Sequence, residues 1–199
     1  MKKIFLMLLS LALFSFALTI LFLSMRAIMA IGGSCAEGGP YVIANRCPGG
    51  TAWLTPLSIF MMIGGGVMYF VYSAAVENSP KWGYFFWSAL FLSLGWNFLE
   101  SSINPPGGGI EIGWLICGIM FFIMGGAPLF ILKGDTQQII NEHGRKQEVS
   151  TLKRVVLGQN KQSNTAGNKF YETQTTLLIF HVIATLGGIY LGYLAFINT

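Results

Sequence analysis

Residues 4–25, IFLMLLSLALFSFALTILFLSM, form an unbroken apolar run of the length that a transmembrane helix needs. An α-helix rises 1.5 Å per residue, so about 20 residues cross a hydrocarbon core about 30 Å thick. The run follows Lys2 and Lys3, as in a secretory signal peptide, but the apolar part of a signal peptide has about 7–15 residues and a small-residue cleavage site. The best candidate site, residues 27–30, has Ile28 where a small side chain is needed. We therefore expect an uncleaved first helix.

Four more apolar runs follow, at residues 53–76, 82–99, 110–132 and 177–197. Pro80 lies in the short polar segment between the second and third runs and breaks the helix there. Lipid offers no partner to backbone N–H and C=O groups, so segments this long and apolar are expected to be helical. The sequence predicts an all-α fold, a polytopic transmembrane bundle of about five spans, in a single domain covering residues 1–199.

The composition agrees with a membrane protein. Hydrophobic residues make up 53% of the 199 residues and charged residues only 10%, whereas about a quarter of the residues of a soluble domain are charged. The net charge of +4 comes from basic residues spread along one expected membrane face rather than packed into one tract. That distribution predicts contact with the lipid bilayer and no nucleic-acid partner.

The loops predict the orientation, because Lys and Arg accumulate on the cytoplasmic side of membrane proteins. With the amino terminus in the cytoplasm and the carboxyl terminus outside, Arg26 and Arg46 lie in an outer loop at 26–52. The other ten basic residues then face the cytoplasm: Lys2, Lys3, Lys81, Lys133, Arg145, Lys146, Lys153, Arg154, Lys161 and Lys169. Seven of them, from Lys133 to Lys169, lie in a polar segment at 133–176.

Two cysteines, Cys35 and Cys47, lie in the expected outer loop. An oxidising compartment favours a disulfide between them, and closing a loop of about 13 residues removes roughly 3 kcal/mol of chain entropy from the unfolded state. A redox-active pair usually has the closer Cys-x-x-Cys spacing, and two cysteines do not complete a tetrahedral zinc site. We expect a disulfide-stapled loop and no metal or cofactor.

The loop sequence at 32–50, GGSCAEGGPYVIANRCPGG, carries a resemblance. It is similar to the first outer loop of a group of uncharacterised bacterial integral membrane proteins with the pattern GGxCAxGGPYxI followed by CPxG. The resemblance covers about twenty residues. It implies a bacterial origin, and with it the cytoplasmic (inner) membrane, but no activity.

Four polar residues in or near the expected spans form a candidate polar site. Asn97 and Glu100 are three residues apart, on one helical face, and Glu111 opens the fourth span. Ionisable groups in lipid often serve a function, here a cation or proton site. The structural alternative is that both carboxylates lie at the interface, with Glu111 near a helix amino terminus that favours an anion. His181 in the fifth span is a candidate proton relay or, as we favour, a hydrogen-bonding partner of another helix.

Small residues recur at helical spacing in the fifth span, at Ala184, Gly188 and Gly192. Such rows let two helix backbones approach closely, and they predict packing within the chain or, alternatively, between subunits. Cys117 in the fourth span is expected to be a small buried apolar residue.

The polar segment contains a helical pattern of apolar residues at Val149, Leu152, Val155 and Val156. We expect a short amphipathic helix there, lying on the inner leaflet or docked on a protein partner. Residues 158–168 have the composition of a linker.

Three classes of function remain. An accessory or interaction subunit of an envelope complex is favoured, because it needs surfaces for a protein partner rather than chemistry. The outer loop and the amphipathic segment are the expected surfaces. A small ion or solute transporter or channel needs polar groups at mid-membrane or a broken helix, and the glycine triplet at 64–66 is a candidate hinge. An integral membrane enzyme is less expected, because the candidate residues Glu100 and Glu111 have no nucleophile, metal ligands or phosphate-binding partner to act with.

Overall fold

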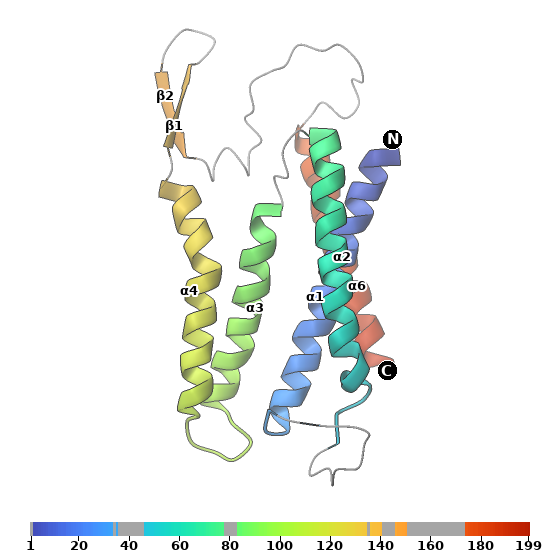
Figure 1. The fold of residues 1–199 in the computed structure, drawn as a ribbon, viewed down its shortest axis with the longest axis vertical. Coiled ribbons are helices and arrows are strands. Elements are labelled where there is room, and N and C mark those ends of the chain that lie inside the picture. The colour runs from blue at the N-terminus through green and yellow to red at the C-terminus, as the bar shows by residue number, and fades with distance from the viewer. Residues whose placement is uncertain are drawn as a thin grey trace.

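The structure is a computed structural model that describes residues 2–33, 35, 46–77, 83–134, 136–140, 146–150 and 174–199. In this part of the chain five helices run side by side along one axis (Figure 1). They are α1 (Lys2–Ala30), α2 (Thr51–Glu77), α3 (Tyr84–Ile103), α4 (Ile112–Gly134) and α6 (Gln174–Ile197). The expected all-α helical bundle is confirmed, with one addition, a two-stranded hairpin of β1 (Thr136–Ile140) and β2 (Lys146–Ser150).

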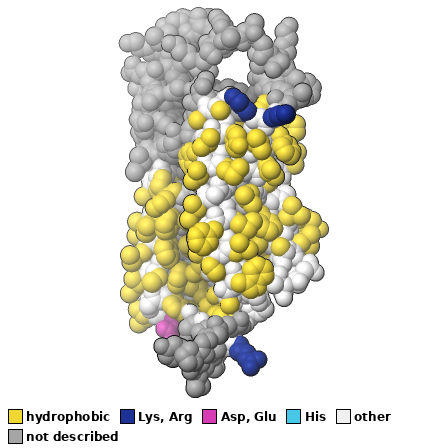
Figure 2. All heavy atoms as spheres, turned by 45° about the vertical axis from the view of Figure 1, so that its right-hand side comes forward, with side chains coloured by type: hydrophobic (Ala, Val, Ile, Leu, Met, Phe, Trp, Pro, Cys, Tyr) yellow, Lys and Arg dark blue, Asp and Glu magenta, His cyan; other side chains and the backbone are white. Residues whose placement is uncertain are grey.

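Four of these helices, α1, α2, α4 and α6, are long and apolar enough to cross a membrane. Figure 2 shows one face of the molecule, on which hydrophobic side chains extend along the helices and the charged side chains gather near the ends. A water-soluble protein does not expose apolar surface on this scale, so the chain is a membrane protein. Of the about five expected spans, α3 is the one described helix that falls short of this apolarity, because Asn97, Glu100 and four serines lower its hydropathy.

The two termini lie at opposite ends of the bundle (Figure 1). Helices α1, α3 and α6 begin at the end that holds Lys2 and the β hairpin, which we call the amino-terminal end. Helices α2 and α4 run in the opposite direction. The other end, called the disulfide end, holds the connection from α1 to α2 and the carboxyl terminus.

Helix α1 continues to Ala30, five residues beyond the predicted end of its apolar run. It ends because Gly32 and Gly33 adopt φ values of 102° and 82°, which favour glycine, and their N–H groups donate to the last carbonyls of the helix. The connection to α2 is therefore shorter than the loop expected at 26–52, and Arg26 belongs to the helix.

The centre of the bundle is α1, which makes extensive contacts with α2 and α6. Phe14, Ala17 and Leu21 of α1 pack with Met62 of α2 in one buried cluster. Glycine brings the backbones together, since a Cβ added to Gly65 of α2 would lie 2.9 Å from the Phe14 nitrogen. Helices α1, α2 and α6 thus form one three-helix unit.

Helices α3 and α4 form a hairpin of their own. An added Cβ on Gly118 of α4 would lie 3.0 Å from the Leu99 nitrogen, and one on Gly125 would lie 2.9 Å from the Leu92 nitrogen. This hairpin meets the three-helix unit mainly through α3 and α1. Because the α1–α3 contact is less extensive than those within either unit, space remains between the two units.

The prediction of an amphipathic helix at 149–156 is wrong at its first residue, Val149. Val149 lies in strand β2 and pairs with Gln137 of β1. The helical spacing of four apolar residues is too short a pattern to exclude a strand, and the neighbouring segment at 136–140 supplies an antiparallel partner. Leu152, Val155 and Val156 lie outside the described residues.

Candidate functional site

A groove of about 700 Å³ lies between α1, α3 and α6. Its floor is a stripe of α1 from Leu11 to Leu23, and its walls are residues 85–93 of α3 and 185–193 of α6. All three helices begin at the amino-terminal end, so the groove runs along the bundle axis. The lining is mostly aliphatic and aromatic.

Four hydroxyl groups in the groove donate to carbonyl groups of their own helices. Ser15 donates to Leu11 at 3.0 Å and Thr19 to Ser15 at 2.9 Å. Ser93 and Thr185 make the same kind of bond at 2.8 Å. Because these donors are already used, the groove presents little directed polarity and suits a hydrocarbon better than a hydrated solute.

Polar contacts join α1 to α3 near the disulfide end. The Asn97 side-chain nitrogen donates to the Phe22 carbonyl at 2.9 Å, and the Arg26 guanidinium forms an ion pair with the Glu100 carboxylate. Asn97 is 1% exposed, whereas the side chains of Arg26 and Glu100 are 48% and 35% exposed. We call the last two the Arg26–Glu100 pair.

The structure brings only part of the candidate polar site together. Asn97 and Glu100 lie on one face of α3, as their spacing predicted, and this face meets α1. Glu111 precedes α4, where its carbonyl accepts the N–H of Leu115 and its own N–H donates to Ser102. Its side chain is exposed and makes no ion pair with the described residues. Among the described residues, Glu111 therefore takes no part in the ion pair of Glu100.

Three side-chain oxygens of α1 and α3 are buried without a hydrogen-bond partner among the described residues: Oγ of Ser24, Oγ of Ser88 and Oδ1 of Asn97. A buried amide oxygen without a partner costs about 1–3 kcal/mol. The amide is held nonetheless, because its nitrogen bonds to α1.

His181 is also buried, 1% exposed, and lies between α6 and α2. Its Nδ1 is 2.8 Å from the Leu177 carbonyl, and its Nε2 is 3.1 Å from the Tyr69 hydroxyl. A carbonyl only accepts, so in the neutral imidazole Nδ1 carries the hydrogen and Nε2 accepts from Tyr69. His181 thus links α6 to α2. This is the role favoured from the sequence, a hydrogen-bonding partner of another helix.

The row of small residues in α6 faces α1. Ala184 packs against a cluster that includes Met7 and Leu11. A Cβ added to Gly188 would overlap the Ala12 carbonyl oxygen, and one on Gly192 would lie 2.7 Å from the Phe16 carbonyl oxygen. These contacts are internal to the chain.

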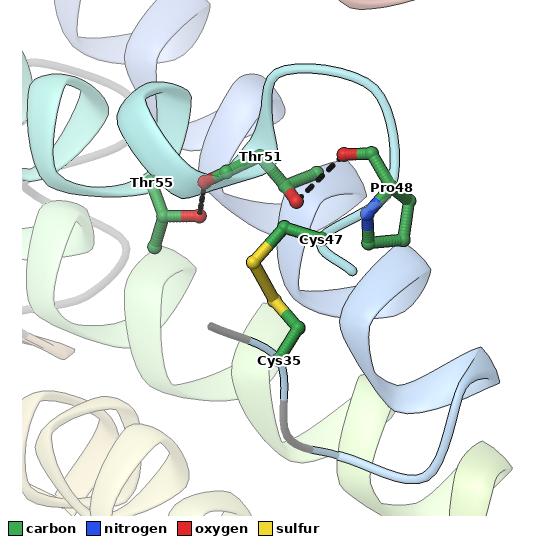
Figure 3. The surroundings of a disulfide bond; sticks show 5 residues. All are labelled: Cys35, Cys47, Pro48, Thr51 and Thr55. Atoms are coloured by element: carbon green, nitrogen blue, oxygen red, sulfur yellow. Dashed lines mark hydrogen bonds between the residues drawn. A yellow bond between two sulfur atoms is a disulfide. The ribbon is translucent and has the colours of Figure 1, made fainter. Parts of the chain in front are cut away.

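The disulfide between Cys35 and Cys47 forms as expected, with their Cα atoms 5.0 Å apart (Figure 3). It lies directly before α2, where the Thr51 hydroxyl donates to the Pro48 carbonyl at 2.7 Å. The bridge and this bond fix the start of α2. Residues 36–45, between the cysteines, lie outside the described residues.

Cys117 departs from its expected role. It is a free cysteine on α4 and is exposed rather than buried. It lies on a part of α4 that α3 does not cover, so lipid is its expected environment.

Sequence reasoning missed three features of this site. Arg26 was placed in a loop, Tyr69 was not singled out, and the groove had no linear signal. The described residues contain no group of three or more His, Cys, Asp or Glu that could hold a metal ion. Comparisons with protein-family models, with curated proteins and with solved structures found no match.

Proposed function

We propose that this protein is an accessory or interaction subunit of an envelope complex in the bacterial cytoplasmic membrane. Its amino-terminal end faces the cytoplasm and its disulfide end faces outward. The observation that supports this function is the β hairpin, which stands outside the helices at the amino-terminal end (Figure 1).

The hairpin is a sheet of two strands, so each strand has one edge without a partner strand in the described part of the chain. A two-stranded sheet alone is marginally stable, and a third strand supplied by another protein would satisfy the free N–H and C=O groups of an edge. Of the helices, only α4 makes more than sparse contact with it. Among the described residues no third strand pairs with these edges, which supports the hairpin as the surface for a partner.

The charge distribution supports the orientation. The ten basic residues that the positive-inside rule assigns to the cytoplasm include Lys2 and Lys3 at the start of α1 and Lys146 in β2. A partner that docks on the hairpin would accordingly be a cytoplasmic protein or a cytoplasmic segment of a membrane protein.

The test is affinity purification of the full chain from membranes in a mild detergent. We expect a stoichiometric partner, and we expect replacement of residues 136–150 by a Gly/Ser linker of equal length to reduce its recovery at least tenfold. The matched control replaces residues 158–168, the predicted linker, in the same way and should retain the partner. A chain that purifies alone, or a partner that survives loss of the hairpin, contradicts the proposal.

A further inference from the structure

The groove between α1, α3 and α6 has the dimensions of one membrane leaflet. Its floor spans residues 11–23 of α1, which is about 18 Å at 1.5 Å per residue. Half of a hydrocarbon core about 30 Å thick is about 15 Å. A single acyl chain that lies along α1 would therefore run the length of the groove from the membrane surface to the bilayer centre.

The Arg26–Glu100 pair marks the end of the groove that meets the membrane surface. Arg26 is one helical turn beyond Phe22 and Leu23 on the floor, and Glu100 is two turns beyond Ser93 on the wall, each on the same helix face. Arg26 also directly follows the apolar run of α1. The pair thus lies at the depth of lipid headgroups, on the axis of the groove.

The two charges of the pair are opposite, and both side chains remain partly exposed. Guanidinium groups bind phosphate through two parallel hydrogen bonds, and a carboxylate accepts hydrogen bonds from a primary ammonium group. A headgroup that carries both a phosphate and a primary amine complements both residues. An anionic headgroup without an amine would satisfy Arg26 and be repelled by Glu100.

We infer that the groove is a binding site for a glycerophospholipid with a primary-amine headgroup, such as phosphatidylethanolamine. One acyl chain lies along α1 between α3 and α6, the phosphate contacts Arg26 and the ammonium group contacts Glu100. The site is independent of the proposed partner-binding hairpin, which lies at the other end of the molecule.

Native mass spectrometry of the full chain, titrated with lipids of identical acyl chains, tests the inference. We expect phosphatidylethanolamine to bind roughly tenfold more tightly than phosphatidylglycerol or phosphatidylcholine, the change produced by loss of a charged hydrogen bond. Arg26→Glu should remove this preference. The charge swap Arg26→Glu with Glu100→Arg should restore it, because the headgroup can bind in the reverse direction.

A second pair of variants tests the groove itself. Ala89 lines the groove, and Ala89→Phe would fill it and should weaken phosphatidylethanolamine binding about tenfold. The matched control is Ala74→Phe, at an exposed alanine of α2 outside the groove, which should bind as the native chain does. Equal affinities for the three lipids, equal behaviour of the two Phe variants, or photocrosslinking of the groove to a protein helix in place of lipid would overturn the inference.

Discussion

Gly187 and Gly188 are adjacent glycines of α6 with opposite surroundings. A Cβ added to Gly188 would overlap the Ala12 carbonyl oxygen of α1, whereas one added to Gly187 would meet nothing within 4 Å. The backbone of α1 cannot move away without opening the seam between the helices. Only one of the two positions therefore requires glycine.

Gly188→Ala is expected to destabilise the protein by about 1–3 kcal/mol, the usual cost of overpacking. Gly187→Ala should be neutral or stabilising by up to about 1 kcal/mol, because alanine favours a helix more than glycine does. Thermal unfolding of both variants in detergent measures the difference. Equal melting temperatures would show that α6 does not pack on α1 as described.

Tyr69→Phe is expected to cost about 1 kcal/mol, because it removes the hydroxyl bonded to Nε2 of the buried His181. Tyr72 of the same helix offers the control, since its hydroxyl has no such bond to the described residues. Tyr72→Phe should unfold at nearly the native temperature. A larger loss for Tyr72→Phe than for Tyr69→Phe would contradict the role assigned to His181.

At the level of single residues, the sequence predicted which residues share a helix face but not which residues they contact on other helices. The spacing of Asn97 and Glu100 correctly placed them on one face of a helix. Arg26, the partner of Glu100, is 74 residues away, and the pairing depends on how α1 and α3 are rotated toward each other. No local pattern encodes that rotation.

At the level of secondary-structure elements, the clearest prediction concerns the connection from α1 to α2, which the Cys35–Cys47 disulfide closes. Cys35→Ser with Cys47→Ser should lower stability by roughly 3 kcal/mol, through the entropy that the open loop regains in the unfolded state. A reductant should lower the melting temperature of the native chain and leave that of the double variant unchanged. Thermal unfolding with and without reductant measures both.

Cys117→Ser is the control for this experiment, because Cys117 is a free cysteine. It should keep the full response to reductant. A double variant that still responds to reductant would show that another thiol pair carries the effect.

The helices were predictable because their signal is local and long. Each described helix contains most of an apolar run, with ends that differ by a few residues where caps such as Gly32 decide. The β hairpin was not predictable in this way, since strand pairing joins 136–140 to 146–150 through backbone contacts. At Val149 that pairing outweighs the helical spacing of the apolar residues.

For the whole molecule, the opposite placement of its termini predicts a topology. Reporters fused to Lys2 and to Thr199 should report from opposite sides of the membrane, with the amino-terminal reporter in the cytoplasm because of the basic residues at that end. The topology is measured with two reporters, one active only in the cytoplasm and one active only outside it. Signals from one compartment would contradict both the number of crossings and the orientation.

The groove is a property of the whole molecule, and it explains why function was harder to predict than fold. Its lining comes from three helices that are far apart in the sequence, such as Phe22, Ser93 and Tyr193. Each of these residues is ordinary on its own helix. The site exists only because the α3–α4 hairpin and the three-helix unit leave space between them.

The seam between α1 and α6 has a consequence for biosynthesis. The ribosome makes α1 first and reaches Gln174, the start of α6, more than a hundred residues later, an interval on the order of ten seconds at 5–20 residues per second. Throughout that time α6 cannot cover the surface of α1 around Ala12 and Phe16. Until α6 is made, the central helix of the nascent chain lacks one of the helices that pack on it. Insertion chaperones and quality-control proteases have their best access to the chain at this stage.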